Sequence, residues 1–247
     1  MARTPIVASS EFTGGTFMIH GPYGSGKTNL IGDMLHAESE HGPVRLINLK
    51  GEDGFLSIMP EIIAEAEGET VSEYVDLVAA LEDAKKAGVR AIGIDGFHRI
   101  YSFVYRKLFG SDRMPSIGGQ RNEWGDAHKL AGDLMDLLRY YAPIVVVSSA
   151  SDKSLDQLRG ETHTTPNFPG QMAAGVGGRF DFVFYLDSEV IGPTKIKRTL
   201  RTAPVSKMVV RYRLPRPLPP SIELPDGKGG WALVVNAINK AMNGAAK

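Results

Sequence analysis

The chain of 247 residues contains no cysteine, which excludes disulfide bonds and thiolate metal sites. It also has no net charge, because 28 Lys and Arg balance 28 Asp and Glu, so no global field draws it toward nucleic acid or membrane. Long apolar runs are missing as well: the longest, 140–147, is interrupted by Pro143, and residues 1–5 hold no apolar signal core. We therefore expect a soluble cytoplasmic protein.

The sequence does have enough apolar residues, 43 %, to bury a full core. Its length predicts a single α/β domain over residues 1–247, with an N-terminal extension (1–14) and a basic, proline-rich β extension (188–225). Strand-like apolar runs alternate with helix-length segments, which predicts a mainly parallel central sheet with helices on both faces. The predicted strands are 16–20, 44–49, 91–95, 144–149 and 180–187, and the predicted helices are 29–37, 56–66, 72–87, 97–108, 123–141 and 231–242.

Two segments rich in turn formers, 110–120 and 151–178, interrupt this alternation. We expect both to be irregular, because glycine and proline favour turns over regular structure. Long loops of this kind usually carry function.

The most specific motif is residues 21–28, which fit the phosphate-loop pattern G-x-x-x-x-G-K-S/T without a mismatch. Such a match arises by chance in roughly one chain in a hundred, and here it stands between an apolar strand and a helix. The glycines let backbone N–H groups point at phosphates, Lys27 reaches the β- and γ-phosphates, and the Thr28 hydroxyl ligates Mg²⁺. The predicted nucleotide-binding residues are Gly21, Pro22, Tyr23, Gly24, Ser25, Gly26, Lys27 and Thr28.

Polar residues follow three other predicted strands. Asp95 ends the third strand at the edge that presents the phosphate loop, so it is the candidate second Mg²⁺ contact, although it could also cap the helix beginning at Phe97. Glu52 or Asp53, after the second strand, would orient a water at the γ-phosphate, or both would cap the next helix. The fourth strand ends in Ser148 and Ser149, whose hydroxyls could report the state of the γ-phosphate, and Ser149 is taken as the nucleotide-binding residue, although a simple strand end gives the same residues.

Together these motifs resemble the short RecA-like P-loop ATPases encoded by bacteriophages, including those linked to single-strand annealing and recombination. The resemblance rests on the phosphate loop and on residues 50–54, 94–96, 148–149 and 166–171. It implies ATP hydrolysis with Mg²⁺, Glu52 as the water-activating residue, and a homo-oligomer with nucleotide at the subunit interface. It also implies that basic residues on late strands act on a neighbour's nucleotide, for which Lys207 and Arg211 are the candidates. A phage protein of this kind would work in the cytoplasm of the bacterial host.

The resemblance further implies single-stranded DNA as a partner, bound on the loops after the third and fourth strands. The candidate DNA-binding residues are Arg113, Arg121, Lys153 and Arg159, with Trp124 and Phe168 as stacking partners. Residues 188–216 add eight basic residues against one acid, which predicts a local cationic surface. Alternation along a strand would place Lys207, Arg211 and Arg213 on one face, as a solvated edge strand also would.

Three functions follow from these features. A DNA-dependent ATPase would be stimulated by DNA. A small-molecule kinase would need an acceptor and would close segment 151–178 as a lid. A nucleotide-switched assembly or packaging factor would respond to a protein partner. A regulatory GTPase is disfavoured, because the residue at the fourth position of Asp95-Gly96-Phe97-His98 is not glycine and no Asn-Lys-x-Asp occurs.

Overall fold

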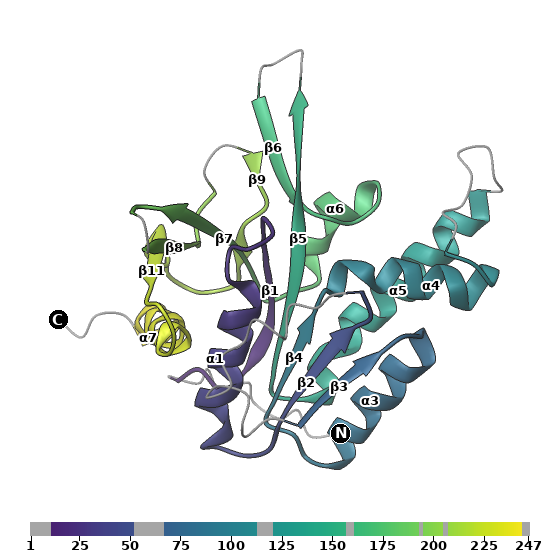
Figure 1. Ribbon diagram of the computed structural model, residues 1–247, viewed down its shortest axis with the longest axis horizontal. Coiled ribbons are helices and arrows are strands. Elements are labelled where there is room, and N and C mark those ends of the chain that lie inside the picture. The colour runs from purple at the N-terminus through teal and green to yellow at the C-terminus, as the bar shows by residue number, and fades with distance from the viewer. Residues whose placement is uncertain are drawn as a thin grey trace, which may run out of the picture.

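The computed structural model describes residues 11–51, 67–112, 121–156, 161–192, 195–204 and 207–243. A twisted sheet runs through the molecule, with helices on both sides (Figure 1). Its strands are β1 (Gly15–Gly21), β2 (Val44–Leu49), β3 (Glu67–Val71), β4 (Ala91–Asp95), β5 (Ile144–Asp156), β6 (Glu161–Pro166), β7 (Phe182–Val190), β8 (Ile196–Arg201), β9 (Lys207–Met208), β10 (Arg211–Tyr212) and β11 (Ser221–Leu224). Its α-helices are α1 (Lys27–Ser39), α3 (Tyr74–Lys86), α4 (Ile100–Phe109), α5 (Arg121–Tyr141), α6 (Gln171–Gly175) and α7 (Gly230–Asn243), joined by the 3-10 helices η2 (Phe97–Arg99) and η3 (Val176–Gly178).

The strand order confirms the predicted fold class, α/β with a mainly parallel sheet. The order is β11-β8-β7-β1-β5-β4-β2-β3, and the strands from β7 to β3 pair in parallel. The C-terminal extension adds β8, β10 and β11 to the same sheet in antiparallel pairing. Parallel pairing places β1, β4 and β5 side by side with their carboxyl ends at one edge, where the phosphate loop begins.

Two hydrophobic clusters lie on the two faces of the sheet, because the buried residues of parallel strands need cover on both sides. Helices α1 and α7 cover one face, and Trp231 packs there against Phe17 with ring centroids 5.1 Å apart. Helices α3, α4 and α5 cover the other. Helix α1 approaches β4 very closely, since a Cβ on Gly93 would lie 2.4 Å from the Ile31 side chain. The helix that follows the phosphate loop is thus held firmly on the sheet.

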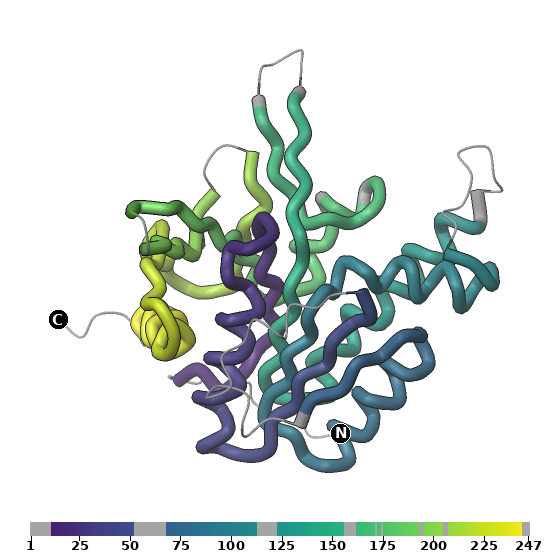
Figure 2. Tube along the Cα trace, in the orientation of Figure 1, coloured from purple at the N-terminus to yellow at the C-terminus, as the bar shows by residue number. Residues whose placement is uncertain are grey.

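Segment 151–178 is not the irregular loop that the sequence predicts. Strand β5 continues to Asp156 and pairs antiparallel with β6, and the helix α6 follows. The β5–β6 hairpin projects from the top of the molecule in Figure 1, and the tube in Figure 2 shows β9 alongside it. The prediction that this segment is irregular is therefore wrong.

Two further differences from the predicted elements are found. Strand β3 is absent from the predicted strands. Residues 207–213 are not one strand, because β9 pairs with β6 whereas β10 pairs with β7. The predicted helix 56–66 lies outside the described residues.

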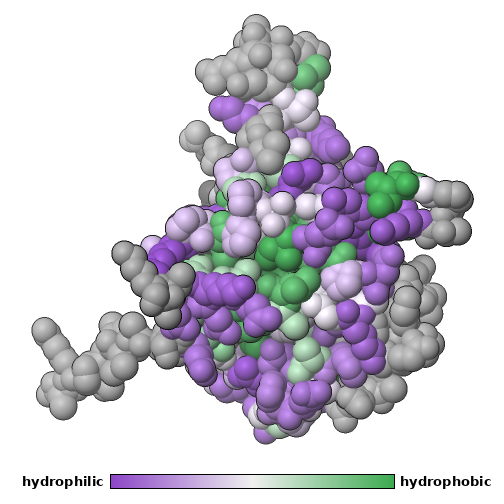
Figure 3. All heavy atoms as spheres, turned by 90° about the vertical axis from the view of Figure 1, so that its left-hand side faces the viewer, coloured by the Kyte–Doolittle hydropathy of each residue, from purple (hydrophilic) through white to green (hydrophobic). Residues whose placement is uncertain are grey.

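The face that carries α7, β8 and β11 is mainly hydrophilic around an apolar area near its centre (Figure 3). In the described part of the chain, no helix is both long enough and apolar enough to cross a membrane.

Candidate nucleotide-binding site

The phosphate loop joins β1 to α1 at the carboxyl edge of the sheet. Gly24 and Gly26 have φ angles of 75° and 96°, in the left-handed region that glycine adopts without strain. Gly21 is required for a different reason, because a Cβ there would lie 2.1 Å from the carbonyl oxygen of Leu186 on β7. The loop is thus a built backbone concavity, open above Gly24, where a Cβ would meet nothing within 4 Å.

Lys27 folds back over this loop. Its Nζ donates hydrogen bonds to the carbonyl oxygens of Gly21 and Pro22, at 3.0 and 2.7 Å. The exposed Tyr23 ring lies 5.8 Å from the same nitrogen. The ammonium group is therefore already centred on the loop, where a phosphate would meet it.

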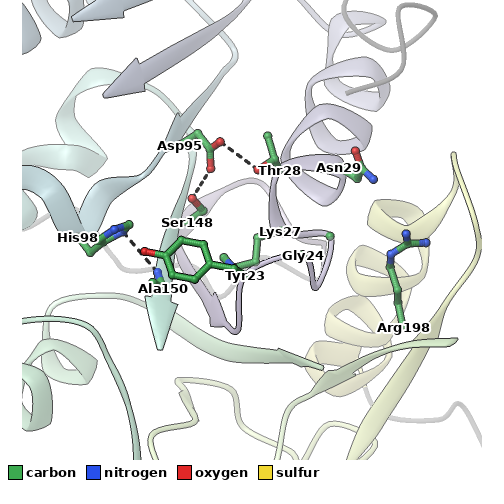
Figure 4. Close-up of a pocket in the computed structure, with 11 residues that line it drawn as sticks. Tyr23, Gly24, Lys27, Thr28, Asn29, Asp95, His98, Ser148, Ala150 and Arg198 are labelled. Carbon is green, nitrogen blue, oxygen red and sulfur yellow. Dashed lines mark hydrogen bonds between the residues drawn. The ribbon is translucent and has the colours of Figure 1, made fainter. Parts of the chain in front are cut away.

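Thr28, Asp95 and Ser148 form a hydrogen-bonded group beside Lys27 (Figure 4). The Thr28 hydroxyl donates to Oδ2 of Asp95 at 2.9 Å, and the Ser148 hydroxyl donates to Oδ1. Ser148 in turn accepts a hydrogen bond from the backbone N–H of Gly96 at 2.9 Å. The register explains the contact: Ile94 on β4 pairs with Val147 on β5, so the residues that follow them are neighbours. A hydroxyl beside a carboxylate supplies the hard oxygen ligands that Mg²⁺ prefers.

These residues line a pocket of about 310 Å³. Three buried polar atoms at the loop, Ser25 Oγ, Asn29 Oδ1 and Arg198 Nε, have no hydrogen-bond partner among the described residues. Buried polar groups are normally paired, so they fit a site that receives a polar ligand. The lining residues are Tyr23, Gly24, Gly26, Lys27, Thr28, Asn29, Asp95, His98, Ser148, Ala150 and Arg198.

Ser149, predicted to contact the γ-phosphate, points elsewhere. Its hydroxyl is fully buried and donates to the carbonyl of Ala150 at 2.8 Å. Neighbouring residues of a strand face opposite sides, so only one of the two serines can meet Asp95. The structure places Ser148 there, which corrects the choice made from the sequence.

His98 and Arg198 line the pocket, although no sequence motif singles out either residue. The ring of His98, in η2, accepts a hydrogen bond from the N–H of Ala150 at 3.4 Å and lines the pocket. The sequence feature that could have identified His98 is its position three residues after Asp95, near the end of the third predicted strand. Arg198 was grouped with the other basic residues of 188–216, and only the pairing of β8 distinguishes it from them.

His20 lies directly below the loop at the end of β1 and is fully buried. Its Nε2 lies 2.7 Å from the carbonyl of Val209, and its Nδ1 lies 2.8 Å from the hydroxyl of Ser151. A carbonyl only accepts, so Nε2 carries the proton and Nδ1 accepts from Ser151. The pKa of His20 is lowered to about 4, mainly by burial. The hydrogen bond to the Val209 carbonyl raises this pKa, and the positive charge of Lys27 lowers it. A neutral His20 thus ties the hairpin and segment 207–213 to the phosphate-loop strand.

The water-activating candidates Glu52 and Asp53 lie outside the described residues. The residue before them, Gly51, has a φ of 94°, and a Cβ there would lie 2.8 Å from Nη1 of Arg99. The guanidinium group of Arg99 therefore lies next to Gly51, just after the end of β2.

The predicted DNA-binding residues do not gather in one described place. Lys153 is exposed on the hairpin, whereas Arg121 begins α5, in the helical arm at the right of Figure 1. Arg113 and Arg159 lie outside the described residues. Phe168 is buried in the core, which corrects its expected stacking role, and Trp124 is half-buried against Tyr105 and His128.

Four of the eight basic residues of 188–216 pair with acids. The ion pairs are Lys197–Glu223 (2.9 Å), Arg198–Asp226 (2.5 Å), Arg201–Asp187 (3.4 Å) and Arg213–Asp181 (3.9 Å). The charge of the predicted local cationic surface is therefore partly offset. Lys207 and Arg211 are exposed and do not line the pocket of their own chain.

Comparison with known proteins gives one family. Residues 13–214 match the AAA domain family. Among solved structures, a KaiC-like protein from the archaeon Pyrococcus horikoshii OT3 is similar, with 13 % identity, a TM-score of 0.48, and coverage of 86 % of this chain and 90 % of that one. Comparison with curated proteins gave no match.

Proposed function

Because the chain belongs to the AAA domain family, we propose that it binds ATP with Mg²⁺ on loop 21–28 and hydrolyses it. The observation that carries the proposal is the junction of Lys27, Thr28 and Asp95 at one pocket. A loop, a cation and a hydroxyl–carboxylate pair are the parts that phosphoryl transfer to water requires.

In this proposal, different groups of the site bind the phosphates and the metal. Backbone N–H groups of the loop and the N-terminus of α1 hold the phosphates. Lys27 exchanges the carbonyls of Gly21 and Pro22 for phosphate oxygens, while Thr28 and Asp95 hold the metal, with Ser148 fixing the carboxylate. When bound, Mg²⁺ neutralises negative charge on the β- and γ-phosphates.

The test is Lys27→Ala. We expect ATP affinity to fall at least about tenfold and hydrolysis to disappear, because the loop loses the ammonium group of Lys27 that would bind the phosphates. Lys86→Ala, on the exposed face of α3, is the matched control and should behave as wild type. Hydrolysis retained in Lys27→Ala would refute the site.

We assign water activation to Glu52. Glu52→Gln should bind ATP normally and stop turnover, since the amide cannot accept the proton. Normal turnover would transfer the role to Asp53 or to a neighbouring subunit.

We further propose that the ATPase acts on single-stranded DNA in phage recombination or replication. The resemblance to phage RecA-like proteins supports this, as does the exposed Lys153 on a hairpin that His20 and Ser151 connect to β1. Binding of a labelled single strand should weaken as salt rises, and Lys153→Ala should reduce the salt slope by roughly 0.7, the value for one phosphate contact on a single strand. No binding at low salt with ATP present would contradict it.

The trans-acting role of Lys207 and Arg211 belongs to the same proposal, with nucleotide at a homo-oligomer interface. Mixing inactive Arg211→Ala with inactive Lys27→Ala should restore activity, because each subunit supplies what the other lacks. A mixture that stays inactive would place Arg211 outside the reaction.

A further inference from the structure

Arg198 occupies a position on β8 that its basic neighbours do not share. It pairs with Ser188, and Leu200, two residues on and therefore on the same face, is fully buried between the sheet and helices α1 and α7. Lys197 faces the opposite side and pairs with Glu223. Arg198 therefore lies on the core-facing side of β8, beyond the last buried residue, and its side chain reaches the phosphate loop.

The guanidinium group packs directly on that loop. A Cβ on Gly26 would lie 2.7 Å from Arg198 Nε and 2.8 Å from its Cδ. The side chain is only 17 % exposed, and it lines the pocket together with Asn29. Arg198 also borders a small neighbouring hollow with Pro225 and Gly227.

The hydrogen bonding of Arg198 is incomplete. Nη1 binds Asp226 at 2.5 Å, but the buried Nε has no partner among the described residues. Asn29 Oδ1, at the same end of the pocket, is also buried without one. Asp226 is 60 % exposed and lies in the turn before α7. A surface carboxylate therefore binds one end of the guanidinium group, while the Nε–H of Arg198, unpaired among the described residues, lies against Gly26 of the phosphate loop.

Figure 4 shows Arg198 and Asp95 on opposite sides of the loop. Thr28 and Asp95 would hold Mg²⁺ beside the β- and γ-phosphates on one side, so the side of Gly26, Asn29 and Arg198 would receive the α-phosphate and the nucleoside. We propose that Arg198 is a nucleotide-contacting residue supplied by the same chain, which binds the α-phosphate and which Asp226 holds when nucleotide is absent. This rests on the proposed function of loop 21–28.

Nucleotide binding then exchanges one anion for another at Arg198. Asp226 competes with the phosphate and lowers affinity, and the exchange frees the turn that leads into α7. An ion pair that only stabilised the fold would not oppose the ligand.

The test compares dissociation constants for ATP and ADP by titration calorimetry. Arg198→Ala should weaken both about tenfold and equally, because both nucleotides share the α-phosphate. Asp226→Asn should tighten both about threefold, and Arg198→Ala with Asp226→Asn should match Arg198→Ala alone. Lys197→Ala, the neighbour on the opposite face, should bind as wild type.

Three results would overturn the inference. If Arg198→Ala binds ADP with the affinity of wild type, Arg198 does not contact the α-phosphate. If the substitution weakens the binding of ATP alone, the guanidinium group lies at the γ-phosphate instead. Weaker binding in Asp226→Asn would make the pair structural. Failure of the proposed function is distinguishable, because then Lys27→Ala and wild type would bind nucleotide equally.

Discussion

The side chain of Asp95 forms hydrogen bonds with two other residues of the site. Its two oxygens accept from Thr28 and Ser148, which fixes the carboxylate next to the phosphate loop. The sequence predicted Thr28 and Asp95 from the motif and from the end of a buried strand. It could not predict that Ser148 binds Asp95 or that Arg198 lines the pocket, because these contacts depend on strand register and on which face of β8 each side chain occupies.

Asp95→Asn keeps the size of the side chain and one acceptor oxygen, but it replaces the other oxygen with an NH2 group and removes the charge that would bind Mg²⁺. We expect steady-state ATP turnover to fall roughly a hundredfold, about 2.7 kcal/mol of transition-state stabilisation, with a higher Mg²⁺ requirement. Asp83→Asn, on the exposed end of α3, serves as the control. Turnover and Mg²⁺ dependence equal to wild type would remove Asp95 from the metal site.

His20 predicts a pH dependence of stability. Its pKa is about 4 in the folded protein and about 6.5 when unfolded, so between these values the unfolded state binds more protons. The stabilisation is therefore present above pH 6.5 and is lost as pH falls toward 4, by up to roughly 3 kcal/mol.

Urea unfolding at several pH values measures this loss. His20→Gln retains an N–H for the Val209 carbonyl and does not titrate, so its stability should vary less between pH 6.5 and 4 than that of wild type. Parallel curves for the two proteins would show that His20 does not titrate as described.

At the scale of elements, the buried strands were predictable and the exposed ones were not. Strands β2 and β4 match the predicted residues because their apolar runs are covered on both faces. Edge strand β3 pairs with β2, and among its described side chains only Val71 is buried. The β5–β6 hairpin is polar because it leaves the core, so it lacks the apolar pattern that identifies a strand.

The start of α7 depends on a buried carboxylate of α1. Asp33 accepts hydrogen bonds from the backbone N–H groups of Gly229 and Trp231, at 2.8 and 2.6 Å. Asp33→Ala leaves both donors unpaired, so the free energy of unfolding should fall by about 2–3 kcal/mol.

Asp83→Ala, which removes an exposed carboxylate on α3, should change stability by no more than about 0.5 kcal/mol. Both variants are compared with wild type by urea unfolding. Equal stability of Asp33→Ala and Asp83→Ala would show that Asp33 does not hold α7.

At the scale of the whole molecule, hydrogen bonds of His20 connect the nucleotide site to the projecting hairpin. Ser151 at the base of the hairpin and Val209 beside β9 both bind His20, one residue before the phosphate loop. A strand of DNA on the hairpin would therefore act close to the nucleotide. The sequence predicted the fold class and the loop, but it could not predict the ion pairs that offset part of the positive charge of residues 188–216, because their acids come from other strands and turns.

The most direct measurement is steady-state ATP hydrolysis with Mg²⁺, with and without single-stranded DNA, at low and moderate salt. The account predicts hydrolysis that DNA raises several-fold and a stimulation that fades as salt increases. Absence of hydrolysis under every condition would contradict the ATPase itself. Hydrolysis without stimulation at any salt would contradict DNA as the partner and direct the search to a protein or a small-molecule acceptor.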